Sequence, residues 1–196
     1  MRAALRDLPR LILASASPRR AELLRQLNLE FEVVPADVPE LHHEQMTAVE
    51  LCQVNAYRKA RVVAKKVPEA LVLAADTLVC LDAALFGKPA TLEEAYRMLE
   101  RLQGRTHQVV TGICLLHLRN HRQSVLVEST AVSFRPLDDA RIRQYLSRVN
   151  PMDKAGAYAI QEAGDLIIEG IVGSYTNVVG LPIERLTAEL ESWATR

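Results

Sequence analysis

Residues 10–26 read RLILASASPRRAELLRQ, and this stretch decides the fold that we expect. Leu11–Ala14 is a short apolar run, which is typical of a buried strand. Ser17 is a suitable N-cap residue and Pro18 suits the first helical position, so we expect a helix from Pro18 to about Gln26. The stretch therefore predicts a strand, a turn and a helix, as in an α/β protein.

Strands and helices continue to alternate after this stretch. Capping-box spacing, as in Thr47–Glu50 and Thr91–Glu94, marks two helix starts, and Arg119–Arg122 separates two β-rich runs as in an antiparallel hairpin. Because a hairpin interrupts the alternation, we expect an α/β fold with a mixed sheet and flanking helices. The further elements expected are helices at 47–66, 91–102, 138–150 and 182–193, and strands at 31–34, 71–75, 78–81, 109–118, 124–134, 157–160 and 166–171.

The composition indicates a folded protein without a strong net field. The chain is 49% hydrophobic, and its 24 basic side chains balance 24 acidic ones, so the formal net charge is zero. Binding to long polyanions or to anionic membranes usually relies on a basic field, which this chain lacks overall. An anionic ligand would therefore have to be small and to meet basic residues that are gathered locally.

Several absences also restrict the expectation. The first ten residues lack the apolar core of a signal peptide, and no stretch approaches the roughly 18 apolar residues of a membrane span, so a cytoplasmic protein is expected. Cys52, Cys80 and Cys114 show no CxxC spacing, which speaks against a disulfide framework or a zinc site. Because repeats and low-complexity linkers are absent, we expect a single domain over residues 1–196, with two continuous lobes and a ligand crevice between them.

The turn after the first strand is a candidate phosphate site. Ser15 and Ser17 offer hydroxyls, Arg19 and Arg20 offer guanidiniums, and the helix amino terminus offers N–H groups. Two arginines in the first turn oppose the helix dipole unless an anion compensates for them. We therefore expect phosphate binding, with Ser15 and Ser17 as ligands; the alternative is a capped helix whose arginines face solvent.

Asp76–Thr77 is a polar pair inside an apolar sequence. It lies at the expected carboxyl end of the strand 71–75, which is the edge where α/β sheets bind ligands. A carboxylate there can bind Mg²⁺ or accept a proton from a water that attacks phosphorus; the alternative is a turn residue. Glu40 could join Asp76 as a metal ligand, although a surface position explains it equally well.

Three of the five lysines occupy motif or turn positions. Lys59 lies on a long helix, where a surface role is the alternative, and Lys88 lies in Gly87–Pro89, which lacks P-loop spacing. Lys154 is a further candidate for phosphate binding. The segment 173–182 fits either a phosphate loop or a tight connection to the last helix.

Taken together, these stretches resemble the Maf family of nucleoside triphosphate pyrophosphatases. The resemblance implies a two-lobed α/β fold around a central cleft, similar to inosine triphosphate pyrophosphatases, with a divalent cation, Mg²⁺ or Mn²⁺. It also implies hydrolysis of a nucleotide to its monophosphate and pyrophosphate. The matching stretches follow the family's order over nearly the whole chain: LASASPRR at 13–20, ADT at 75–77, GKP at 87–89, HQVVTG at 107–112, DKAGAYAIQ at 153–161, GSY at 173–175 and NVVGLP at 177–182.

The resemblance also implies roles for particular residues. Asp76 matches the family's proton acceptor, and in our hypothesis it is also a metal ligand. Glu40 matches an acidic position near the metal. Arg20, Lys59 and Lys88 match the family's catalytic cations, which would neutralise the triphosphate.

Substrate preference is implied by three further positions. Arg19, Thr77 and Gln161 together resemble the dTTP/UTP pyrophosphatase subgroup, whereas the subgroup that prefers 7-methyl-GTP has Trp where Arg19 stands. The chain departs from the family pattern where glycines are common, at Ala16, Ala159 and Glu162. The last two flank Gln161 in sequence and bear on the nucleobase preference, including modified bases.

We therefore predict an enzyme that hydrolyses dTTP and UTP, including modified pyrimidine nucleotides, through metal-assisted attack of water on the α-phosphorus. The partner expected is a small nucleoside triphosphate, without membrane or nucleic acid, and the resemblance suggests a homodimer. The alternative is a non-catalytic nucleotide- or nucleic-acid-binding regulator of cell division, since the family is associated with septum formation. Asp76 favours the enzyme, because an anion-binding groove gains nothing from a carboxylate unless a metal binds there.

Overall fold

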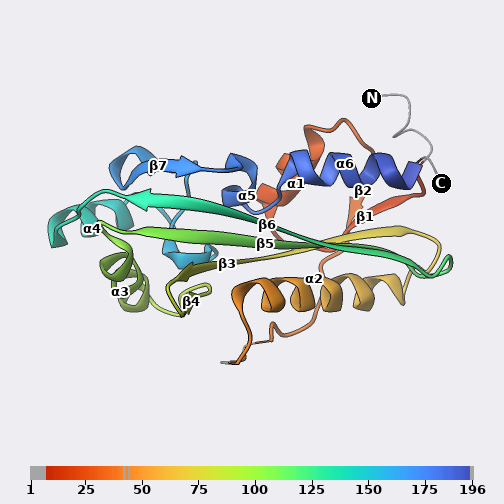
Figure 1. The fold of residues 1–196 in the computed structure, drawn as a ribbon, viewed down its shortest axis with the longest axis horizontal. Coiled ribbons are helices and arrows are strands. Elements are labelled where there is room, and N and C mark those ends of the chain that lie inside the picture. Colours follow the sequence, from red (N-terminus) through yellow and green to blue (C-terminus); the bar gives the residue numbers. More distant parts are fainter. Residues whose placement is uncertain (1–7, 42, 44, 195–196) are drawn as a thin grey trace. The chain divides into compact units, whose positions relative to one another are not determined.

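The computed structural model describes residues 8–41, 43 and 45–194 (Figure 1). The amino-terminal segment that bears on a targeting signal is therefore described only from residue 8. Among the described residues, we find no helix with the length and apolar character that crossing a bilayer requires. The elements are β1 (Leu11–Leu13), α1 (Pro18–Arg25), β2 (Phe31–Val33), α2 (Ala48–Ala64), β3 (Leu71–Leu81), β4 (Ala84–Phe86), α3 (Leu92–Leu102), β5 (Thr106–His117), β6 (Arg122–Phe134), α4 (Asp139–Leu146), β7 (Ile168–Val172), α5 (Tyr175–Val179) and α6 (Ile183–Ala194).

The strands form a mixed sheet, which confirms the predicted α/β class. Seven strands take part, in the order β2-β1-β3-β5-β6-β7, with β4 paired to β3. β1 runs parallel to both β2 and β3, whereas β4 and β7 pair antiparallel to β3 and β6. The parallel part contains β1, which leads through a turn into α1, as the sequence predicts.

The chain divides into two compact units. The first comprises the residues up to Asp76, Thr111–Glu128 and the residues from Gly180 onward; the second comprises Thr77–Val110 and Ser129–Val179. Strands β3, β5 and β6 contribute residues to both units.

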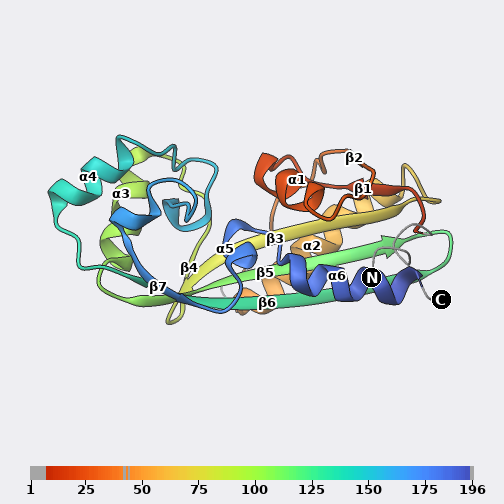
Figure 2. The same cartoon turned by 90° about the horizontal axis from the view of Figure 1, so that it is seen from above.

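In the first unit, α2 and α6 cover opposite faces of the sheet (Figure 1), and in the view from above α2 lies behind the strands (Figure 2). Thr47 and Glu50 form the predicted capping box of α2, with the Glu50 carboxylate accepting from the Thr47 N–H at 2.8 Å. The buried face of α2 is lined mainly by small residues, which allow a close approach to the strands. At Gly112 in β5, a Cβ atom would collide with the backbone of Cys52 in α2, so glycine is required for this approach.

In the second unit, α3 and α4 pack around an aromatic cluster. The rings of His107, Phe134 and Tyr158 meet edge to face, with the Phe134 centroid 4.8 Å from each of the other two. His107 Nε2 shares a 2.8 Å hydrogen bond with the Tyr158 hydroxyl. Burial lowers the pKa of His107 to about 4, so this imidazole is neutral near pH 7.

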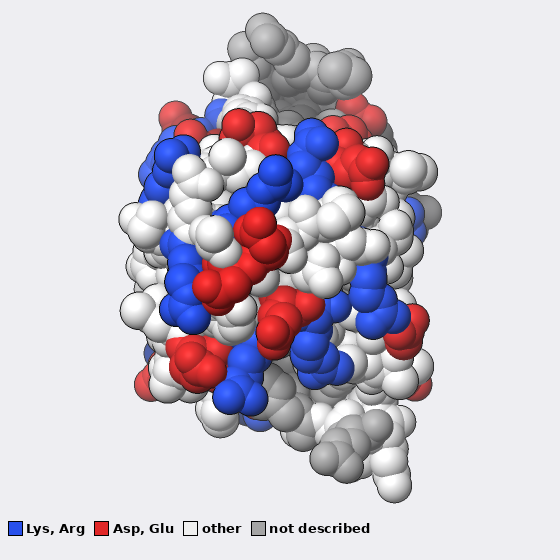
Figure 3. All heavy atoms as spheres, turned by 90° about the vertical axis from the view of Figure 1, so that its left-hand side faces the viewer, with Lys and Arg blue, Asp and Glu red and all other residues white. Residues whose placement is uncertain are grey.

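The surface charges are interspersed in sign on the face shown in Figure 3. Ion pairs four residues apart support this pattern: Arg97 with Glu93 on α3 at 3.1 Å, and Arg143 with Asp139 on α4 at 3.0 Å. These pairs are exposed, and such pairs contribute little stability. The face offers no extended basic patch for a long polyanion.

Three sequence predictions need correction. The runs 71–75 and 78–81 form the single strand β3, so Asp76 and Thr77 lie inside a strand rather than at its end. Residues 157–160 are not a strand, because Gly156 and Ala157 adopt left-handed backbone with φ of 68° and 65° within a 3₁₀ turn. The helix expected at 138–150 already ends at Leu146.

Candidate active site

The turn between β1 and α1 forms as the sequence predicts. The helix begins at Pro18, and the Ser17 hydroxyl accepts from the Arg20 N–H at 3.5 Å, which caps the helix. The Ser15 hydroxyl accepts from the Ser17 N–H at 3.2 Å. Ala16, where the family commonly has glycine, is not among the residues with positive φ, so alanine fits this turn.

Arg20 joins three separate segments of the first unit. Its Nε donates to the Gly180 carbonyl at 2.8 Å, and its Nη1 donates to the Ala75 carbonyl at 2.9 Å and to the Ser15 hydroxyl at 3.4 Å. Burial lowers the pKa of Arg20, while the negative charges of Asp76 and Glu40 oppose this shift. An arginine stays protonated under such conditions, so a positive charge is fixed beside Asp76. The alternative in which both arginines face solvent is therefore wrong for Arg20.

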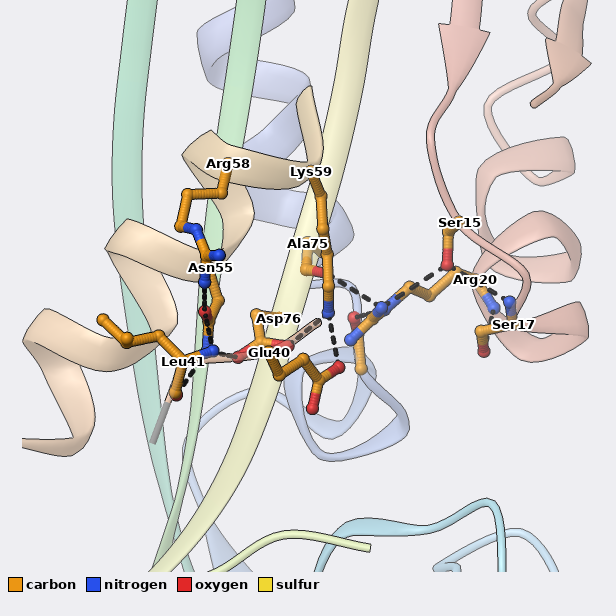
Figure 4. A network of polar contacts seen from close by, with 11 residues as sticks. Ser15, Ser17, Arg20, Glu40, Leu41, Asn55, Arg58, Lys59, Ala75 and Asp76 are labelled. Carbon is orange, nitrogen blue, oxygen red and sulfur yellow. Dashed lines mark hydrogen bonds and ion pairs between the residues drawn. The ribbon is translucent and has the colours of Figure 1, made fainter. Parts of the chain in front are cut away.

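Asp76 is a buried carboxylate, and Lys59 lies against it (Figure 4). The Lys59 Nζ atom is 2.5 Å from Asp76 Oδ1 and 2.6 Å from Glu40 Oε1. The Lys59 side chain is 12% exposed, so it is not the surface lysine that was the alternative interpretation. Its ammonium bridges two carboxylates that would otherwise repel each other in a buried place.

Asn55 also contacts Asp76, although no sequence motif marks it as a site residue. Its Nδ2 donates to Asp76 Oδ2 at 3.2 Å and to the Leu41 carbonyl at 3.2 Å, and its Oδ1 accepts from the Leu41 N–H at 2.7 Å. An Asn within a helix carries no motif. The signal that could have found it is its spacing, because Asn55 precedes Lys59 by four residues and shares its helix face.

The donor set is suited to a hard cation that also binds phosphate. Among the described residues, no group of three or more His, Cys, Asp or Glu side chains could hold a metal ion. Mg²⁺ commonly binds proteins through one or two carboxylates, while water and substrate phosphates complete its shell. Asp76 and Glu40, held by one ammonium, fit such an incomplete site.

Arg19 is half-buried in the first turn of α1 in the first unit, and its role stays a prediction, whereas the other remaining predicted residues belong to the second unit. Thr77 follows Asp76 in β3 and is half-buried, while Lys88, after β4, and Gln161, in a turn, are exposed. Lys154 is buried, with its Nζ atom 2.8 Å from Asp153 Oδ1 and 3.2 Å from Glu162 Oε1. Lys154 thus already has internal partners, and its phosphate role stays a prediction, as do the roles of the other three.

A family model and several known proteins match this chain over most of its length. A family model described as "Maf-like protein" matches residues 10–193. A "dTTP/UTP pyrophosphatase" of Ruminiclostridium cellulolyticum is 45% identical over 182 residues, which cover 92% of this chain and 94% of that protein. A second "dTTP/UTP pyrophosphatase", from Myxococcus xanthus, is 49% identical over 181 residues, which cover 92% of this chain and 91% of that protein. A solved HAM1 protein of Coxiella burnetii gives a TM-score of 0.45 at 22% identity, covering 65% of this chain and 73% of that one.

Proposed function

The chain belongs to the Maf-like family, and from this premise we propose that it hydrolyses dTTP and UTP to the nucleoside monophosphate and pyrophosphate. Relatives that are 43–49% identical over most of the chain bear the name of that activity. One observation carries the proposal within the structure: Lys59 pairs with both Asp76 and Glu40, and Arg20 is fixed beside them. Two carboxylates and two cations in one place suit the cleavage of a phosphoanhydride.

The chain's own residues supply both charge and a proton acceptor. Asp76 accepts a proton from the attacking water while the water oxygen bonds to the α-phosphorus. The bond between the α-phosphorus and the oxygen that bridges the α- and β-phosphates breaks. Pyrophosphate leaves with the electron pair of that bond. Arg20 and Lys59 stabilise the negative charge on the phosphate oxygens. When bound, a divalent cation, Mg²⁺ or Mn²⁺ held by Asp76 and Glu40, supplies further positive charge to those oxygens.

The remaining recognition falls to the other residues that the sequence predicts. We assign Lys88 and Lys154 to the phosphates and Gln161 to the polar edge of uracil or thymine. Arg19 and Thr77 would shape the entrance for the base. A pocket that hydrogen-bonds uracil rejects cytosine more strongly than it rejects an added methyl group, which fits acceptance of both UTP and dTTP.

We further propose that the whole chain works as one Maf-like domain, in a homodimer, on nucleotides of the cytoplasm. Its partner would be the small nucleoside triphosphate alone, with neither nucleic acid nor membrane. On the face shown in Figure 3, basic and acidic side chains are interspersed, so this one face does not favour a polynucleotide.

A panel of nucleotides tests the proposal. The purified protein is incubated with each nucleoside triphosphate and Mn²⁺, and released pyrophosphate is measured, with Asp76→Asn as the matched control. We expect release from dTTP and UTP well above that from CTP. Absence of pyrophosphate from every nucleotide would favour the non-catalytic regulator, and release of orthophosphate would indicate a different phosphatase reaction.

A further inference from the structure

We infer that Asn55 is a positioning residue, whose side-chain amide fixes the orientation of the Asp76 carboxylate and ties the segment that carries Glu40 to it. The inference rests on the proposed function, because it gives Asn55 a task in the reaction assigned to Asp76. Asn55 therefore acts through the carboxylate and not by contact with the phosphate or the attacking water.

Asn55 is 2% exposed, and its amide is fully occupied. One amide nitrogen donates at 3.2 Å to both Asp76 Oδ2 and the Leu41 carbonyl, which matches its two N–H groups. The amide oxygen accepts from the Leu41 N–H at 2.7 Å and from Arg58 Nη1 at 3.5 Å. A buried amide with so many partners has little freedom to rotate.

The two oxygens of Asp76 are held by different residues of α2. Lys59 approaches Oδ1, and Asn55, one helical turn earlier, approaches Oδ2 (Figure 4). Two donors from one rigid helix fix the plane of the carboxylate, which a single donor would leave free to turn. The amide makes this contact without adding a third positive charge to those of Lys59 and Arg20, because an asparagine side chain is neutral.

Through its contact with Leu41, Asn55 also fixes the position of Glu40. Asn55 binds both the N–H and the carbonyl of Leu41, as a neighbouring strand would. Glu40 is the residue before Leu41, and its Oε1 reaches the same Lys59 ammonium as Asp76. One amide thereby sets the position of both carboxylates that are assigned to the metal.

A positioning role and a purely structural role for Asn55 predict different orders of kcat for the variants Asn55→Asp and Asn55→Ala. Asn55→Asp keeps the acceptor for the Leu41 N–H, but it loses both donors and places a negative charge against Asp76 Oδ2. Asn55→Ala loses every contact but adds no charge. If Asn55 only fastened the segment at Leu41, Asn55→Asp would be the milder change; if it positions Asp76, Asn55→Asp is at least as damaging to kcat.

The experiment measures kcat and KM for UTP, the affinity for Mn²⁺ by calorimetry, and the Tm. For Asn55→Ala we expect kcat to fall about 10–100-fold, KM to stay within twofold, and Mn²⁺ affinity to fall several-fold. Ser124→Ala is the control, because Ser124 holds Glu189 at 2.6 Å and Trp193 at 3.3 Å in the same unit. This control should lower the Tm and leave kcat within twofold.

The outcomes separate this inference from the proposed function. If the wild type releases pyrophosphate while Asn55→Ala matches it in kcat and Mn²⁺ affinity, or Asn55→Asp is the milder variant, the inference fails and the function stands. If the wild type releases none but binds Mn²⁺, weaker binding by Asn55→Ala supports the positioning role, and unchanged binding overturns it. A wild type that neither reacts nor binds Mn²⁺ counts against both.

Discussion

Gly112→Ala tests whether the close approach of β5 to α2 sets both stability and the position of Lys59. An added Cβ atom would overlap the Cys52 carbonyl group and lie 2.8 Å from Gln53 N. The optimal distance between non-bonded carbon atoms is about 3.5–4.0 Å, so β5 and α2 would have to separate by about 1 Å. Because the collision is with backbone, no change of rotamer relieves it.

The cost of this substitution follows from the clash. Overpacking typically costs about 1–3 kcal/mol, and a clash with backbone places Gly112→Ala near 3 kcal/mol of unfolding free energy. For a chain of this size that corresponds to a fall of about 6–12 °C in Tm. Lys59 lies about two turns after Cys52 on α2, and a displacement of about 1 Å at a reacting group can lower kcat about 100-fold.

Urea unfolding and pyrophosphate release from UTP measure the two effects. Gly170→Ala is the matched control, because nothing lies within 4 Å of a Cβ built there and its φ is not positive. The control should stay within about 0.5 kcal/mol of the wild type. If Gly112→Ala behaves like this control in both stability and kcat, the close packing does not position Lys59 and our reasoning is wrong.

Three further predictions concern single groups. Asp76→Asn should lower kcat by about 100-fold or more, since an amide cannot accept the proton, while nucleotide binding by calorimetry stays within a few-fold; near-normal turnover would remove Asp76 from the chemistry. Arg20→Lys should cost about 2 kcal/mol in urea unfolding, because an ammonium cannot reproduce the hydrogen bonds to Gly180, Ala75 and Ser15, and an unchanged unfolding midpoint would contradict this. Burial lowers the pKa of His107 to about 4 from an ordinary 6.5, so the unfolded chain binds more protons below pH 6.5 and stability falls as the pH drops from 6.5 towards 4. Unfolding of wild type and His107→Gln between pH 4 and 7 should show a shallower loss in the variant, and parallel curves would exclude His107 as the cause.

The local structure around α1 could be predicted because it depends on neighbours in the sequence. Ser17 caps the helix through an N–H three residues away, and Pro18 fits the first turn whatever the rest of the chain does. The same holds for the capping box of α2. The prediction failed at Ala157, because alanine carries no signal for a left-handed backbone, which its surroundings impose against a local preference.

The sequence by itself determined the mixed α/β class, the helix starts and the residue types that could bind phosphate, because periodicity and capping act over a few residues. It also supplied the motif in which Asp76 stands. Only the tertiary structure decided what surrounds that carboxylate. Lys59 is 17 residues away and Asn55 is 21 residues away, and they reach Asp76 because α2 packs against β3. Such contacts depend on how helix and strand pack, which no local pattern encodes, and they turn a polar interruption of an apolar run into a buried, paired carboxylate inside one continuous strand.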